Sequence, residues 1–193
     1  DCDGNVLDCS GECGGSAVVD ECGECGGDGT SCLTDYINWN QSQSQAFYYF
    51  DSASLDGLSL TAGDWIVVYN SANGVVVGGA EYTSGSIAVP VMGNDNAFGD
   101  CSITGTCDYL DEGDIPAFGI FQASSGNTYF DLVTEYDAFY NLDIHTDLHI
   151  DLVTDCNGDM GGSAVYDLCG NCSGGNSGFV AGTHDPDGDG VCN

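Results

Sequence analysis

The absence of positively charged side chains is the feature that most constrains how this chain can fold. Its 193 residues include 31 Asp and Glu but no Lys or Arg, so the formal net charge is −31. A charge of this size repels itself and opposes a compact state. A core can still form, because 42% of the residues are hydrophobic and 10% are aromatic. We therefore expect bound counter-ions, and calcium fits best because it takes carboxylate and carbonyl oxygens. Screening by a high-salt environment is the alternative.

The same absence limits the partners that this chain can have. Nucleic acids are bound mainly by Lys and Arg that neutralise phosphates, and anionic membrane surfaces attract basic segments. We expect neither as a partner. No segment is long and apolar enough to predict membrane insertion. The sequence starts at Asp1 without Met or a signal peptide, and we expect a mature form or a piece of something longer.

Cysteine usage indicates an oxidising compartment. The number of cysteines is even and their spacing is tight, which predicts a disulfide framework in a secreted, extracellular protein. Zinc binding by the C-x-x-C pairs Cys22/Cys25 and Cys169/Cys172 is the alternative. Disulfides are favoured because neighbouring negative charge disfavours thiolates. The twelve cysteines are Cys2, Cys9, Cys13, Cys22, Cys25, Cys32, Cys101, Cys107, Cys156, Cys169, Cys172 and Cys192.

Composition divides the chain into three regions. Residues 1–32 and 155–193 are rich in Cys, Gly and Asp, whereas residues 33–154 hold nearly all the aromatic and β-branched residues. The outer regions are copies of one another, because residues 8–25 align with residues 155–172 at a constant offset of 147 without a gap. Such self-similarity indicates a repeated structural unit. The sequence thus predicts an N-terminal Cys-rich repeat, a β domain and a C-terminal Cys-rich repeat, with calcium bound by the two repeats.

A mismatch between the copies predicts one disulfide. Cys13 aligns with Met160, and Cys2 has no counterpart in the second copy, so we expect Cys2 and Cys13 to pair. The four cysteines left in each copy allow three connectivities. We favour a pairing of neighbours in each copy and a clip around the loop in the middle region. The favoured pairs are Cys9–Cys22, Cys25–Cys32, Cys156–Cys169, Cys172–Cys192 and Cys101–Cys107.

The middle region is predicted to be β. Short apolar runs at 46–50, 65–69 and 87–91 are separated by turn residues such as Asn73-Gly74. Many short strands with intervening turns favour a mainly β fold, an immunoglobulin-like or jelly-roll-type sandwich of two sheets, flanked by the irregular disulfide-rich repeats.

Residues 142–152 alternate Leu, Ile or Thr with Asp or His, which predicts a long strand with one apolar face. The opposite face would carry two histidines and three aspartates. We expect ordinary polar side chains facing outward, with a transition-metal site or an edge that pairs with a neighbouring subunit as alternatives. The polar residues are Asp143, His145, Asp147, His149 and Asp151.

Three segments have the spacing of calcium loops. In residues 185–193, 1–8 and 155–159, oxygen-bearing side chains occupy alternate positions with Gly between them, so that the chain can wrap an ion. None has the twelve-residue loop ending in Glu that defines an EF-hand. Asp95 and Asp100 are further candidates in the middle region. The predicted ligands of the three segments are Asp1, Asp3, Asn5, Asp8, Asp155, Asn157, Asp159, Asp185, Asp187, Asp189 and Asn193.

The run at 185–193 resembles thrombospondin type 3 repeats, which bind calcium along a disulfide-bonded acidic ribbon. The block that begins at Asp8 is similar to the DCxGxCGG repeats of large secreted modular proteins of aquatic bacteria. Runs at 45–50, 64–69, 89–95 and 115–118 resemble the β-sandwich module that such proteins carry between these blocks. The resemblance implies a repeating extracellular protein similar to subunits of calcium-stabilised filaments. Met160 departs from the repeat pattern.

These observations favour a structural role. Asn193 followed by another Asp1 would continue the acidic ribbon, so we expect copies of this chain to join head to tail, covalently or not. An adhesin or carbohydrate-binding spacer is the alternative, with an aromatic platform as its sugar site. No pattern of catalytic residues is present, so no enzyme is predicted. The platform candidates are Trp39, Trp65, Tyr48 and Tyr49, and the sequons at Asn40 and Asn171 are candidate glycan sites.

Overall fold

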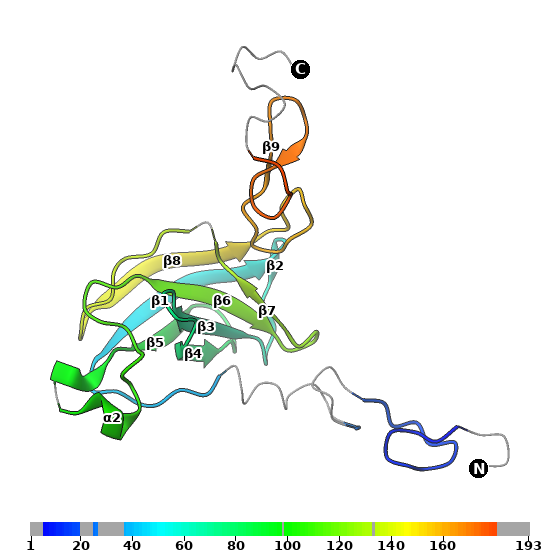
Figure 1. Ribbon diagram of the computed structural model, residues 1–193, viewed down its shortest axis with the longest axis horizontal. Coiled ribbons are helices and arrows are strands. Elements are labelled where there is room, and N and C mark those ends of the chain that lie inside the picture. The colour runs from blue at the N-terminus through cyan, green and yellow to red at the C-terminus, as the bar shows by residue number, and fades with distance from the viewer. Residues whose placement is uncertain (1–5, 20–24, 27–36, 98, 133, 181–193) are drawn as a thin grey trace.

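A computed structural model describes residues 6–19, 25–26, 37–97, 99–132 and 134–180 (Figure 1). Most of the predicted ligands in the two terminal calcium segments lie outside these ranges, as do four cysteines and one histidine. The predicted ligands and cysteines outside the described residues are Asp1, Asp3, Asn5, Asp185, Asp187, Asp189, Asn193, Cys2, Cys22, Cys32 and Cys192, and the histidine is His184.

Strands dominate the described residues. The main strands are β1 (Gln45–Leu55), β2 (Leu58–Ser59), β3 (Trp65–Asn70), β4 (Val76–Glu81), β5 (Ile87–Met92), β6 (Pro116–Gln122), β7 (Asn127–Phe130) and β8 (Ile144–Leu152). The 3-10 turn η1 (Asp95–Ala97) and the single-turn helix α2 (Cys101–Thr104) lie between β5 and β6, and the short strands β9 (Val165–Tyr166) and β10 (Cys172–Ser173) belong to the C-terminal repeat. No described helix is long and apolar enough to cross a membrane. The prediction of a mainly β protein is confirmed.

The eight main strands form one sheet. Its order is β2-β1-β5-β4-β3-β6-β7, and β8 pairs with β1. Only the β1–β8 pair is parallel; the other pairs are antiparallel. A single continuous sheet therefore takes the place of the two sheets that the sequence predicted. Turn-forming residues between the apolar runs predicted many short strands but not how these strands pair.

This sheet is strongly curled. Strands β1 and β6 are separated by three other strands, and a flat sheet with a spacing of about 4.8 Å would hold them roughly 19 Å apart. The rings of Phe50 on β1 and Phe118 on β6 nevertheless lie 5.1 Å apart. Tyr48 also packs on Phe118, and Tyr136 from the connection before β8 completes the cluster. The inner face of the sheet thus closes over a core that includes fully buried residues from most of its strands.

Strand β8 changes face part of the way along its length. His145 is paired with Tyr48 and Leu148 with Phe50, so two residues, Thr146 and Asp147, oppose Tyr49 alone. This is a β-bulge, and the positive φ of 60° at Asp147 fits a residue that tolerates the left-handed region. The extra residue reverses the alternation of side chains.

The bulge corrects the prediction of one apolar face over 142–152. Leu148, Ile150 and Leu152 point into the core as predicted. Leu142 and Ile144, in contrast, are 77% and 62% exposed. His145, predicted to face outward, is buried.

Candidate functional site

One aspartate organises the loop of the C-terminal repeat. Asp155 Oδ1 accepts hydrogen bonds from the backbone N–H groups of Asn157 and Asp159, both at 2.9 Å. Its Oδ2 accepts from the N–H of Ala164, also at 2.9 Å. Desolvation opposes ionisation, but these backbone donors outweigh it and lower the pKa of the Asp155 carboxyl. The side chain closes a loop of ten residues on itself.

The N-terminal repeat builds the same loop at the equivalent positions. Asp8 Oδ1 accepts from the N–H groups of Ser10 at 3.0 Å and Glu12 at 2.9 Å, and Oδ2 accepts from Ala17 at 3.1 Å. The hydroxyl of Ser10 adds a further hydrogen bond at 2.7 Å, and these donors lower the pKa of the Asp8 carboxyl. The offset of 147 found in the sequence therefore holds for the hydrogen bonds as well.

The Gly-Gly pair in each copy has a steric explanation. The first glycine adopts a positive φ, 70° at Gly14 and 71° at Gly161, which is accessible to Gly without strain. The second glycine backs onto the aspartate, because a Cβ at Gly15 would overlap Asp8 Oδ2 and a Cβ at Gly162 would overlap Asp155 Oδ2. The pair thus lets the backbone approach the carboxylate.

The disulfides of the two copies also correspond, but not as predicted. Cys9 pairs with Cys25, and Cys156 pairs with Cys172; both pairs are separated by 16 residues. Since Cys25 and Cys172 are used in this way, the predicted pairs Cys9–Cys22, Cys25–Cys32, Cys156–Cys169 and Cys172–Cys192 are wrong.

The cause of this connectivity is backbone pairing. Cys9 N donates to Ala17 O at 3.4 Å and Gly26 N donates to Val18 O at 2.8 Å, so one short segment brings both sides of the bridge together. Cys13 and Cys169 are also disulfide-bonded. The predicted partner of Cys13, Cys2, lies outside the described residues. The predicted Cys101–Cys107 clip is confirmed. Zinc ligation by Cys25 and Cys172 is excluded, because both are in disulfides.

The structure gives the described calcium candidates a partly different role. Asp155, Asn157 and Asp159 do meet in one loop, where Asn157 Nδ2 donates to Asp159 Oδ2 at 2.9 Å. The carboxylates of Asp8 and Asp155, however, accept backbone N–H groups within their own loops. The signal for this role is an aspartate followed seven residues later by the second glycine of a Gly-Gly pair. Within the described ranges, no three His, Cys, Asp or Glu side chains are placed to share one ion.

The C-terminal repeat is attached to the sheet. Thr154 donates from its N–H to Asp56 Oδ1 at 2.7 Å and from its hydroxyl to Asp56 Oδ2 at 2.8 Å, which lowers the pKa of the Asp56 carboxyl. Met160, the residue that replaces a cysteine, packs against the core of the sheet. A groove of about 710 Å³ between the repeat and β7 is lined by Tyr129, Phe130 and Met160, among others. Figure 1 shows the repeat at the end of β8.

A second polar cluster surrounds Asp95, one of the two candidates of the middle region. Asp95 is 2% exposed, and its Oδ1 accepts from the hydroxyl of Ser42 at 2.7 Å and from the N–H groups of Gln43 at 2.9 Å and Ser44 at 3.3 Å. Burial opposes ionisation, but these donors together lower the pKa of the Asp95 carboxyl. Asp100, the other candidate, is exposed and caps α2 through hydrogen bonds from Ser102.

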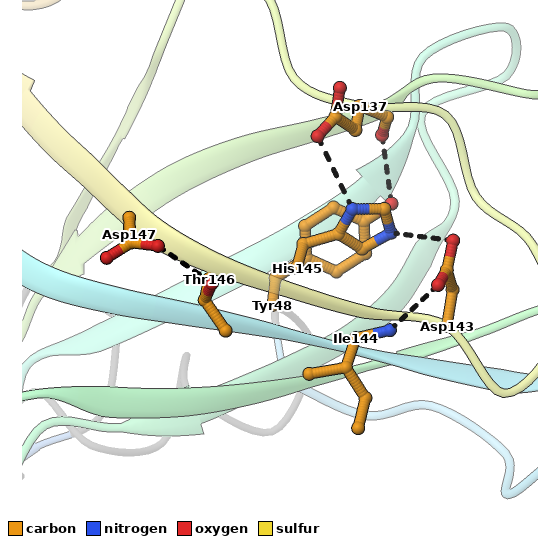
Figure 2. A network of polar contacts seen from close by, with 7 residues as sticks. All are labelled: Tyr48, Asp137, Asp143, Ile144, His145, Thr146 and Asp147. Atoms are coloured by element: carbon orange, nitrogen blue, oxygen red, sulfur yellow. Dashed lines mark hydrogen bonds and ion pairs between the residues drawn. The ribbon is translucent and has the colours of Figure 1, made fainter.

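The buried His145 forms a third cluster, shown in Figure 2. Its ring stacks on Tyr48 with 4.1 Å between the ring centroids. Nδ1 lies 3.5 Å from Asp137 Oδ2, and Nε2 lies 3.8 Å from Asp143 Oδ2. The hydroxyl of Tyr48 donates to the backbone oxygen of Asp137, and burial raises the pKa of this tyrosine.

The His145 cluster does not match the alternatives raised from the sequence. His149 is exposed on the other face of β8 and contacts Ser52, so the two histidines do not share a metal site. The two carboxylates lie near the two different nitrogens of one ring. The cluster ties the segment before β8 to β1.

The predicted sugar platform is not assembled. Tyr48 is fully buried, and Tyr49 is 38% exposed on the opposite face of β1. Trp39 and Trp65 pack against two different clusters of the core. Both predicted sequon residues are exposed, although Asn40 Nδ2 donates to Gly105 O at 3.2 Å.

Comparison with known proteins found no match to this chain among family models, curated proteins or solved structures.

Proposed function

We propose that this protein is an extracellular structural protein, one unit of a head-to-tail filament or fibre that calcium stabilises. The observation that carries the proposal is the pair of matching repeats, one before and one after the curled sheet in the sequence. Each repeat has the same loop, closed by Asp8 or Asp155 and stapled by one disulfide. The contacts that close each loop lie within the repeat itself, so the repeat can be added to a domain as a unit.

The chemistry of the chain supports this proposal. Disulfides persist in oxidising, extracellular environments, and three are described in full. A net charge of −31 without Lys or Arg makes association of like copies unfavourable unless cations lie between them. Calcium ions bound by the acidic ends of two successive units would supply those cations. The proposed ligands are Asp1, Asp3 and Asn5 of one unit and Asp185, Asp187, Asp189 and Asn193 of the unit before it.

In this proposal the middle domain is a spacer. Aromatic and aliphatic side chains fill the inner face of its curled sheet, as in the core of a β-sandwich, which favours a structural role for this domain. We propose no catalytic activity. The partners would be further copies of the same chain, and glycans at Asn40 or Asn171 would be additions to its surface.

Electron microscopy of the full chain with calcium and with excess chelator tests the proposal. We expect ordered polymers in calcium and single units or softened polymers after chelation. Polymers that persist unchanged in excess chelator would contradict calcium joints. A chain that stays monomeric in calcium and binds sugars would instead favour an adhesin or carbohydrate-binding spacer.

A further inference from the structure

Asp95, Ser42, Gln43, Ser44, Thr104 and Thr106 form a corner of the β domain. In this corner one buried carboxylate oxygen, Oδ2 of Asp95, lacks a hydrogen-bond partner within the described part of the chain. Three donors, from Ser42, Gln43 and Ser44, converge on Asp95 Oδ1. Oδ2 is covered and has no hydrogen-bond partner among the described residues. Leaving a buried acceptor of a charged group unpaired costs free energy, so native proteins rarely do so without compensation.

Compensation by a basic side chain is not available in this chain. Lys and Arg are absent from the whole sequence. Of the histidines in the described ranges, His145 faces Asp137 and Asp143, and His149 contacts Ser52. A buried charge is stabilised by hydrogen bonds and by an opposite charge close by. The printed hydrogen bonds to Asp95 reach Oδ1, and an opposite charge near Oδ2 would have to come from outside the chain.

Hydroxyl oxygens lie close to this carboxylate, beside the backbone N–H groups of Gln43 and Ser44. The hydroxyls of Thr104 and Thr106 lie 2.8 Å apart, and Thr106 Oγ1 also accepts from Asp95 N at 3.2 Å. The Thr104 side chain lies near the Asp95 carboxyl and helps to lower its pKa. Thr106 is fully buried, and Ser42 and Ser44 are nearly so. Carboxylate, hydroxyl and carbonyl oxygens are the ligands that hard cations prefer.

The corner is also held in place by the fold. Cys101 and Cys107 are bridged across the loop that carries both threonines, and Thr104 Oγ1 donates to Cys101 O at 3.1 Å. Gly93 N donates to Ser44 O, which joins the end of β5 to the start of β1. The distant segment at 42–44 and the bridged loop that follows Asp95 thus present their oxygens to one place, and a preorganised site loses less free energy on binding.

We propose that this corner binds a hard cation, calcium, with Asp95 Oδ2 as its anionic ligand and with Thr104 and neighbouring oxygens completing the shell. The inference deepens the proposed function, because it puts a calcium ion inside the spacer domain as well as at the joints between units. The site stands apart from the repeats, so it can fail or hold independently of filament formation.

Counting calcium in the full chain tests the proposal. Native mass spectrometry of wild type, Asp95→Asn and Asp100→Asn, each equilibrated with calcium and freed of excess, would give the number of ions per chain. Asp95→Asn keeps the shape and the Oδ1 acceptor but removes the charge. We expect it to hold one calcium ion fewer than wild type and Asp100→Asn to hold the same number. An equal number in Asp95→Asn and wild type would overturn the site.

A second measurement covers the case in which Asp95→Asn does not fold. In calcium titrations of the wild-type chain, the backbone N–H signals of Gln43 and Ser44 should shift, because both groups donate to the carboxylate that binds the ion. Thr104→Val, which leaves these donors in place, should weaken the response at least tenfold. If these signals stay fixed while other signals respond to calcium, the site is wrong even though calcium binds elsewhere. Loss of polymers on chelation tests the joints separately.

Discussion

The two copies of the repeat share one internal structure but relate to the sheet differently. Asp8 and Asp155 close their loops with the same hydrogen bonds, and the same cysteines are bridged. The C-terminal copy is also anchored to the sheet through Thr154 and Met160, whereas the equivalent Leu7 is 55% exposed and Cys13 is in a disulfide. Local sequence is thus sufficient to build the loop, and a few substituted positions decide whether it docks.

Breaking the shared disulfide should have the largest effect and should separate the copies. Replacing both Cys156 and Cys172 by Ser should destabilise the C-terminal repeat by about 3 kcal/mol, because the bridge restricts a loop of this length in the unfolded chain. Replacing Cys9 and Cys25 should cost the N-terminal repeat a similar amount. Hydrogen exchange of each repeat measures the loss.

The two copies should also differ in their effect on thermal unfolding, because the C-terminal copy is anchored to the sheet. Only the C-terminal pair of substitutions should also lower the melting temperature of the sheet, since that repeat packs on it. If the N-terminal pair lowers the melting temperature of the sheet equally, the distinction between an anchored and a free copy is wrong.

Removing the apolar anchor should have a smaller effect. Met160→Ala should lower the free energy of unfolding by about 2 kcal/mol, because a partly buried side chain that packs on the core is truncated. Leu168→Ala in the same repeat is the matched control, because Leu168 is 87% exposed and should change stability little. Chemical denaturation compares the two variants, and equal midpoints would contradict the anchoring role of Met160.

Acid should loosen both copies together. The pKa values of Asp8 and Asp155 are lowered in the folded state, so their hydrogen bonds stabilise the loops above about pH 4, the ordinary pKa range of Asp. This stabilisation is lost as the pH falls through the folded-state pKa. Backbone NMR signals of Glu12 and Asp159 should report the change in parallel. A loop that opens near neutral pH would contradict this assignment.

The smallest expected effect belongs to the polar anchor. Thr154→Val removes the hydroxyl that donates to Asp56 but keeps the backbone N–H bond at 2.7 Å. We expect slightly faster hydrogen exchange in the C-terminal repeat and no change in the N-terminal one. Thr134→Val, outside this contact, serves as the control. Unchanged exchange in the C-terminal repeat of Thr154→Val would assign the docking to Met160 alone.

The sequence by itself determined the repeat, the β content and the disulfide clip at 101–107, because these depend on local composition and short spacings. Connectivity within the repeats was decided by the tertiary structure, since four cysteines at similar spacings allow several pairings until the backbone brings Cys9 beside Cys25. Asp8 and Asp155 were predicted as calcium ligands, and only the fold shows that their carboxylates accept backbone N–H groups.

The same division holds inside the sheet. Alternating residues predicted β8, yet a one-residue bulge at Asp147 turned His145 into the core and left Ile144 outside, a reversal that periodicity alone does not reveal. In the sequence Asp95 is one acidic residue among many, and only the fold buries it between residues 42–44 and the loop that follows it. The absence of Lys and Arg led us to expect counter-ions for the chain as a whole. Only the tertiary structure decided which carboxylate of the described residues has a buried oxygen without a hydrogen bond, because burial depends on contacts between residues far apart in the sequence.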